Sequence, residues 1–156
     1  MKTEYEYRGR VLNFSASKST IKKLYELNRI SAEVWNHCLD LVEHAQASEH
    51  IVTKNFLQSH TKGQYPLHSA CVQTVCIRFA ESRKACYEAR QMGHNNKYPT
   101  YRKTSFPTRW NETGFSLLNT GPRAEEHGDN YKGVLKLSTN IAKSFLYLKV
   151  KDISHG

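Results

Sequence analysis

The chain has 156 residues, with 23 Lys and Arg against 14 Asp and Glu, and a formal net charge of +9. Aromatic residues make up 11% of the sequence, which argues against a disordered chain, and no apolar run is long enough to cross a membrane. A cationic excess of this size favours a polyanionic partner. No secretory signal is visible, so we expect a cytoplasmic protein whose four cysteines are reduced and buried.

In residues 4–14, side chains that favour a strand, aromatic or branched, alternate with charged ones, which predicts a strand. Three amphipathic helices follow, in which apolar residues recur every three or four positions: about 20–48, 52–60 and 67–92. A period of two then predicts three strands, at about 115–118, 132–138 and 144–153, with a polar, turn-rich segment after the first of them. Because a lone first strand would leave its backbone unpaired, we expect it to pair with the late strands. The predicted fold class is therefore α+β, a small antiparallel β-barrel from both ends of the chain with a helical bundle inserted between them.

The helix expected at 67–92 has a mostly apolar stripe on one face and charged residues on the other. Gly93 is its expected stop, because glycine adopts the left-handed conformation that helix ends often need. The predicted stripe comprises Leu67, Ala70, Cys71, Thr74, Val75, Arg78, Ala85 and Ala89.

Residues 93–110 form a basic, aromatic segment with four cations and no acid, and Pro99 and Pro107 keep it out of a regular helix. Residues 24–50, by contrast, carry five acids and one cation, which predicts one basic face rather than a uniform coat. Cations neutralise phosphates and aromatic faces stack on bases. The side chains expected to contact phosphates are Arg78, Arg83, Lys84, Lys97, Arg102, Lys103 and Arg109. Tyr98, Tyr101 and Trp110 are candidates for base stacking, although core packing at the junction of helices and β unit would explain them equally well.

Catalytic and metal chemistry find little support in the sequence. His60, His68, Cys71 and Cys76 are close in sequence, but their spacing fits no common zinc pattern, so we expect neither metal nor cofactor. No cluster of acids suggests a two-metal nuclease. Arg90 and His94 approach the Arg-and-His spacing of some helical ribonucleases but miss it, so we predict no catalytic residues and no hydrolytic activity of this chain alone.

A longer pattern gives a resemblance. Its residues are Gln73, Val75, Arg78, Ala80, Arg83 and Lys84 on a helix, followed by Tyr98, Pro99, Tyr101, Arg102 and Lys103 in a basic loop. This pattern resembles the amino-terminal half of TnpB, the transposon-encoded family of RNA-guided DNA nucleases, and of its relatives, the compact type V CRISPR effectors. Leu24, Asn28, Trp35 and Asn36 also resemble positions of the family's opening helix.

The resemblance implies an oligonucleotide-binding-like β-barrel, called the wedge domain, from residues 1–16 and 111–156. It implies a helical recognition domain with the basic loop at 17–110. Guide RNA and target DNA would be the partners, with Gln73 and Trp110 joining the cations and tyrosines above as nucleic-acid-binding residues. The family's RuvC-type nuclease domain has no counterpart in these residues, so a separate nuclease subunit or domain is a further expected partner. Two alternatives stay open: a stand-alone regulatory or accessory protein derived from such a nuclease, and a compact helical RNase.

Overall fold

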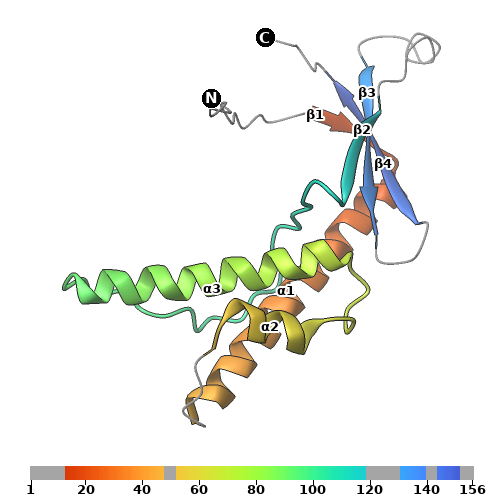
Figure 1. Cartoon of the computed structure of the whole chain (residues 1–156). Coiled ribbons are helices and arrows are strands. Elements are labelled where there is room, and N and C mark those ends of the chain that lie inside the picture. Colours follow the sequence, from red (N-terminus) through yellow and green to blue (C-terminus); the bar gives the residue numbers. More distant parts are fainter. Residues whose placement is uncertain (1–12, 48–51, 119–130, 140–143, 152–156) are drawn as a thin grey trace, which may run out of the picture.

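The computed structural model describes residues 13–47, 52–118, 131–139 and 144–151. Its elements, in chain order, are β1 (Asn13–Ser15), α1 (Lys18–Ala47), α2 (Lys54–Thr61), α3 (Ser69–Gln91), β2 (Phe115–Leu118), β3 (Tyr131–Ser138) and β4 (Phe145–Lys151). The strands gather at the amino-terminal end of α1, and α2 and α3 pack farther along it (Figure 1). The α+β prediction is confirmed, and the predicted helices agree with the observed ones within two residues. Most of the strand expected at 4–14, and the polar segment after β2, lie outside the described residues.

The sheet has the order β1-β4-β3-β2, and all neighbouring strands are antiparallel. The pairing of first and last strands is confirmed, since Phe14 lies opposite Val150. The described strands form an open sheet whose edges are β1 and β2. The prediction of a small antiparallel β unit is therefore confirmed, whereas closure into a barrel is not part of the described structure. Leu137 lies opposite Leu146, and both are buried on the face turned towards α1.

Short polar contacts begin and end the helices. The Ser17 hydroxyl accepts a hydrogen bond from the Thr20 amide at the start of α1, and the His68 side chain accepts one from the Ala70 amide at the start of α3. After α3 the chain turns at Gly93, whose φ of 89° lies in the left-handed region. The predicted helix stop is therefore confirmed, with its physical reason.

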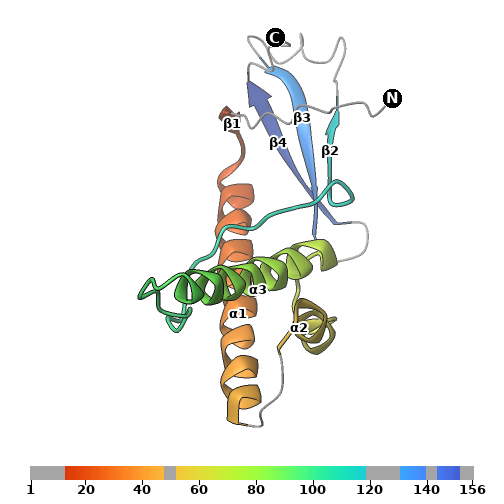
Figure 2. The ribbon, with the colours of Figure 1, turned by 60° about the vertical axis from the view of Figure 1, so that its left-hand side comes forward.

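The buried stripe of α3 differs from the prediction in its second half. Ala70, Cys71 and Val75 are buried as expected, but Phe79 and Cys86 then continue the stripe, while Ala85 is exposed. The two long helices cross rather than run side by side, as Figures 1 and 2 show from two directions. Beyond the crossing, α3 no longer lies against α1. The chain that returns after α3 runs along the carboxyl-terminal half of α3 and packs there in place of α1. Among the described residues, no helix has both the length and the apolar character that a membrane span requires.

Candidate nucleic-acid interface

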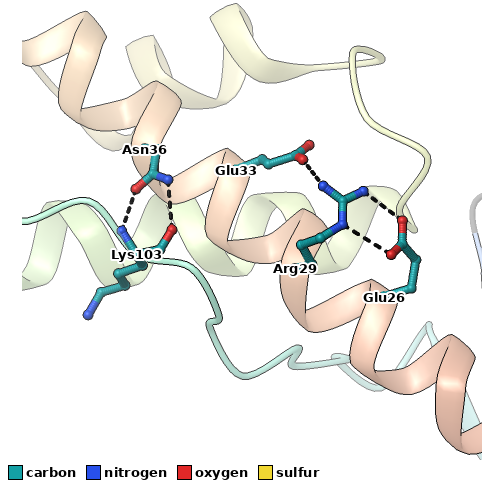
Figure 3. A network of polar contacts seen from close by, with 5 residues as sticks. All are labelled: Glu26, Arg29, Glu33, Asn36 and Lys103. Carbon is teal, nitrogen blue, oxygen red and sulfur yellow. Dashed lines mark hydrogen bonds and ion pairs between the residues drawn. The ribbon is translucent and has the colours of Figure 1, made fainter.

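The segment 94–110 returns along α3 and crosses α1 in an extended conformation (Figure 1). An extended segment without strand partners must find other partners for its backbone polar groups. Asn36 of α1 supplies two of them: its Nδ2 donates to the carbonyl oxygen of Lys103 at 2.8 Å, and its Oδ1 accepts from the Lys103 amide at 2.8 Å. Figure 3 shows this reciprocal pair, with the Lys103 side chain leading away from it. The backbone of the segment is thereby fixed beside α1.

A second attachment lies about two turns earlier on α1. The Asn28 carbonyl oxygen accepts from the Phe106 amide at 3.1 Å, and Asn28 Oδ1 accepts from the Thr108 amide at 3.0 Å and the Thr108 hydroxyl at 2.8 Å. Ser31, which is fully buried, has its hydroxyl 3.0 Å from that of Thr108. Two attachment points make the position of the segment a property of the fold rather than of a free loop.

Phe106 anchors the segment in the core between α1 and α3. Its ring is buried, with its centroid 5.0 Å from that of Trp35, which in turn meets Phe79 edge-on at 4.9 Å. Two cations cover this aromatic group: Arg78 Cζ lies 4.9 Å from the Phe106 centroid, and Lys103 Nζ lies 4.8 Å from that of Trp35. Both are half-buried, so the stems of their side chains pack while their charged ends remain at the surface.

Tyr98 forms a second aromatic platform farther along α3. The Cζ atoms of Arg83 and Arg90 lie 5.5 Å and 5.4 Å from its ring centroid. Arg90 follows Arg83 by seven positions, or two turns, so both lie on one side of the helix, and the ring of Tyr98 contacts both. A guanidinium held over a ring keeps its edge N–H groups available for a phosphate.

The structure divides the other predicted phosphate-contacting cations into two groups. Lys84 is paired with Glu88 of the same helix, with Nζ and Oε1 3.9 Å apart, and Arg102 forms an ion pair with Asp40 of α1. Lys97 and Arg109 are exposed, and neither makes an ion pair or a ring contact with another described residue. Within residues 78–110, six cations have no acidic partner among the described residues. Together with Tyr98 we call them the cation–aromatic surface: Arg78, Arg83, Arg90, Lys97, Lys103 and Arg109.

Three predicted site residues lie apart from this surface or have another role. Tyr101 is 85% exposed on the returning segment and is free to stack. Trp110 is half-buried, and its Nε1 donates to the Ser138 carbonyl oxygen at 2.8 Å, so it fastens the segment to β3. Gln73 is exposed and lines a hollow between α2 and α3 together with Gln58, and it makes none of the contacts described above for the returning segment.

The acids of α1 are mostly engaged on its solvent-exposed side. Arg29 lies between Glu26 and Glu33 and pairs with both, as Figure 3 shows. Hydrogen bonding from Arg29 holds the pKa of the Glu26 carboxyl below its usual value. Both acids are exposed on α1, whereas residues 78–110 carry eight Lys and Arg against two acids.

Sequence reasoning assigned no structural role to the residues that hold the surface together, although Asn28 and Asn36 belong to the resemblance described above. Asn28, Ser31 and Asn36 are polar side chains bordering an otherwise apolar helical stripe, and that interruption was the available signal. Arg90 was considered only with His94, and its contact with Tyr98 depends on the return of the chain after Gly93.

Within the parts of the chain that the structure describes, no three His, Cys, Asp or Glu side chains are grouped so that they could share a metal ion. No protein-family model, no curated protein and no solved structure matches the chain.

Proposed function

We propose that the chain binds nucleic acid through the cation–aromatic surface. We further propose that it is the portion of an RNA-guided nuclease system that recognises guide RNA and target DNA, without the RuvC-type nuclease half. In such systems the protein contacts backbone shape while base pairing selects the sequence. Cations held in place by ring contacts suit that division of labour.

The observation that carries the proposal is that Arg83 and Arg90 both lie against the ring of Tyr98. Neither guanidinium is paired with an acid among the described residues, although Glu81 and Glu88 lie on the same helix. A protein that used these arginines only for stability would be expected to pair them with acids. Held over a ring instead, they retain a full charge and a fixed orientation, which is what phosphate recognition requires.

The attachment of the segment 94–110 supports the same function. Asn28 and Asn36 fix its backbone, so Lys97, Lys103 and Arg109 are carried on a positioned scaffold rather than on a flexible tail. Less conformational entropy is then lost when these cations meet a phosphate backbone.

The proposal also divides the chain into two parts. Residues 17–110 would be the recognition-like part, and residues 1–16 and 111–156 the wedge-like part. The open sheet β1-β4-β3-β2 would supply four strands of an oligonucleotide-binding-like barrel, whose closure would join its β1 and β2 edges.

The direct test measures binding of the purified chain to a labelled RNA hairpin and a labelled DNA duplex by fluorescence anisotropy, between 50 and 300 mM KCl. Affinity should fall linearly on a log–log plot against salt. Replacing both Arg83 and Arg90 by Gln should reduce that slope by about 2 and weaken binding to all sequences alike. Arg29→Gln is the matched control, because Arg29 is already neutralised by two acids on α1. Salt-independent binding, or equal losses in the control, would contradict the proposal.

A second experiment separates the guide-RNA proposal from its alternatives. RNA that co-purifies with the chain is sequenced: a single structured RNA supports the guide proposal, whereas no RNA favours an accessory protein and heterogeneous RNA indicates unspecific binding. The RNase alternative is tested with labelled RNA in magnesium or manganese. Cleavage that disappears in an Arg90→Ala, His94→Ala double variant, and also in His94→Ala alone, which leaves the cation–aromatic surface intact, would establish it.

A further inference from the structure

Two of the four cysteines meet in the core where α1 and α3 cross. Cys38 Sγ of α1 lies 3.9 Å from Cys76 Sγ of α3, and both residues are completely buried. Cys71 and Cys86 are also buried, but neither makes a sulfur contact of this kind with another described cysteine. The two thiols are therefore distinguished by position, since the sequence places them 38 residues apart with no CxxC pattern.

A third polar group completes this site. The fully buried Thr61, at the end of α2, has its Oγ1 3.3 Å from Cys76 Sγ. The same hydroxyl also lies 2.8 Å from the Leu57 carbonyl oxygen. Its single proton can be donated to only one of these acceptors, so Thr61 can shift its hydrogen bond to the sulfur when Cys76 ionises.

Thr61 also connects the thiol pair with the surface. Thr61, Leu67 and Val72 line a hollow of about 510 Å³ between α2 and α3. Cys76 lies directly behind Thr61, so a molecule of the size of water or hydrogen peroxide in this hollow is one side chain away from its sulfur. Thr61 and Cys76 are both completely buried, so the reaction requires the Thr61 side chain to turn aside and admit a peroxide from the hollow to the sulfur.

We propose that Cys38 and Cys76 are a site of reversible oxidative modification, at which a peroxide converts the two thiols into a disulfide that ties α1 to α3. The sulfurs must approach from 3.9 Å to about 2.05 Å, which side-chain rotation and a small shift of the crossing helices supply.

The chemistry balances with hydrogen peroxide as the oxidant. The Cys76 thiolate attacks one peroxide oxygen and breaks the O–O bond, which leaves a sulfenic acid on Cys76 and releases hydroxide. The Cys38 sulfur then attacks the sulfenic sulfur, the S–S bond forms, and the hydroxyl leaves as water once it has taken up a proton. In total, two thiols and one peroxide give one disulfide and two waters. A thiol reductant reverses the modification.

The surroundings assign the roles of the two sulfurs, because the Thr61 hydroxyl that lines the hollow contacts Cys76. Hydrogen bonds from Cys38 and from Thr61 lower the pKa of Cys76, which favours its ionisation. The hydrogen bond to Cys76, together with burial, raises the pKa of Cys38, which keeps its proton and stabilises the thiolate beside it. Cys76 is therefore the attacking residue and Cys38 the resolving one.

The test uses the reduced full chain, exposed to hydrogen peroxide under native conditions and then denatured and blocked with N-ethylmaleimide. Intact mass should show two blocked thiols instead of four, and peptide mapping should show Cys38 joined to Cys76. The thermal midpoint of the oxidised chain should rise by about 5 °C or more, because the disulfide closes a long loop. Treatment with dithiothreitol should restore four blocked thiols.

The variants Cys71→Ser and Cys86→Ser should still form the disulfide, whereas Cys38→Ser and Cys76→Ser should not. Circular dichroism of each reduced variant shows whether it folds, and the peptide map of the unaltered chain decides the pairing if a variant does not. Four reactive thiols after peroxide treatment, or a disulfide that includes Cys71 or Cys86, would overturn the proposal. The same disulfide in guanidinium would also overturn it, because the folded geometry would then have no part in the reaction.

Discussion

The side-chain amide of Asn36 pairs with both backbone polar groups of Lys103, as one strand pairs with another, through two hydrogen bonds of 2.8 Å. One side chain of a helix thus replaces a missing strand partner for an extended segment. This contact, with that of Asn28 to Thr108, determines where the cations of the returning segment lie.

Replacing Asn36 by Ala should remove both hydrogen bonds and leave two half-buried backbone groups unpaired. We expect a loss of about 1–3 kcal/mol in the free energy of unfolding, measured by urea denaturation. Nucleic-acid affinity should also fall, because Lys103 is no longer positioned. Asn55→Ala on α2 is the matched control: Asn55 is exposed, and this variant should keep both properties. Equal stability of the two variants would show that the pair with Lys103 contributes nothing.

Tyr98→Leu should remove the platform under Arg83 and Arg90 while keeping an apolar side chain of similar reach. Cation–π contacts at partly exposed sites contribute about 0.5–1 kcal/mol each, so losing the order of two arginines should weaken nucleic-acid binding by about tenfold. Tyr98→Phe keeps the ring and should bind almost normally. If Phe and Leu weaken binding equally, the hydroxyl rather than the ring is the important group.

The fold could be predicted in large part because its signals are local. Apolar periods of three to four and of two located every described element, and the glycine at 93 ended α3 where expected. The continuation of the α3 stripe through Phe79 and Cys86 was not predicted, since it depends on the angle at which α3 crosses α1. Helix crossing follows from how side chains of two elements interlock, and no single stretch of sequence contains that information.

The candidate site was predictable in composition but not in arrangement. The excess of cations and rings in residues 93–110 was evident from the sequence. Which cations are neutralised could be predicted only in part. The pairing of Lys84 with Glu88 follows from their spacing of four on one helix, whereas Arg102 meets Asp40 only once the chain has folded back. Trp110 illustrates the same point: its hydrogen bond to Ser138 makes it a structural fastening between the segment and the sheet.

The free energy of unfolding should fall at alkaline pH in a way that depends on Cys71. Burial raises the pKa of this thiol to about 12, whereas the unfolded chain ionises it near its ordinary value of 9. The unfolded state therefore releases a proton first, and the stabilising contribution is complete below pH 9 and is lost as the pH rises towards 12. Unfolding free energy should fall by up to about 1.4 kcal/mol per pH unit from this group.

Urea denaturation between pH 8 and 11 measures that slope. Cys71→Ala and Cys71→Ser should both flatten it, even though the two variants differ in stability at pH 8. A slope that is unchanged in both variants would mean that the pKa of Cys71 is the same in the folded and the unfolded state.

Asp40→Asn should strengthen nucleic-acid binding, because it frees the Arg102 guanidinium at the edge of the cation–aromatic surface. The pair is exposed on both sides, and such surface pairs add little stability, so the thermal midpoint should stay within error of the unaltered chain. We expect affinity to rise by about twofold to fivefold at 50 mM KCl, and the gain to disappear near 300 mM, where salt screens the added charge.

Glu33→Gln is the matched control: it removes the same charge from the same helix, but beside Arg29 rather than beside the returning segment. A gain confined to Asp40→Asn places Arg102 at the nucleic acid. An equal gain in both variants would reflect net charge alone, and no gain in either would remove Arg102 from the interface.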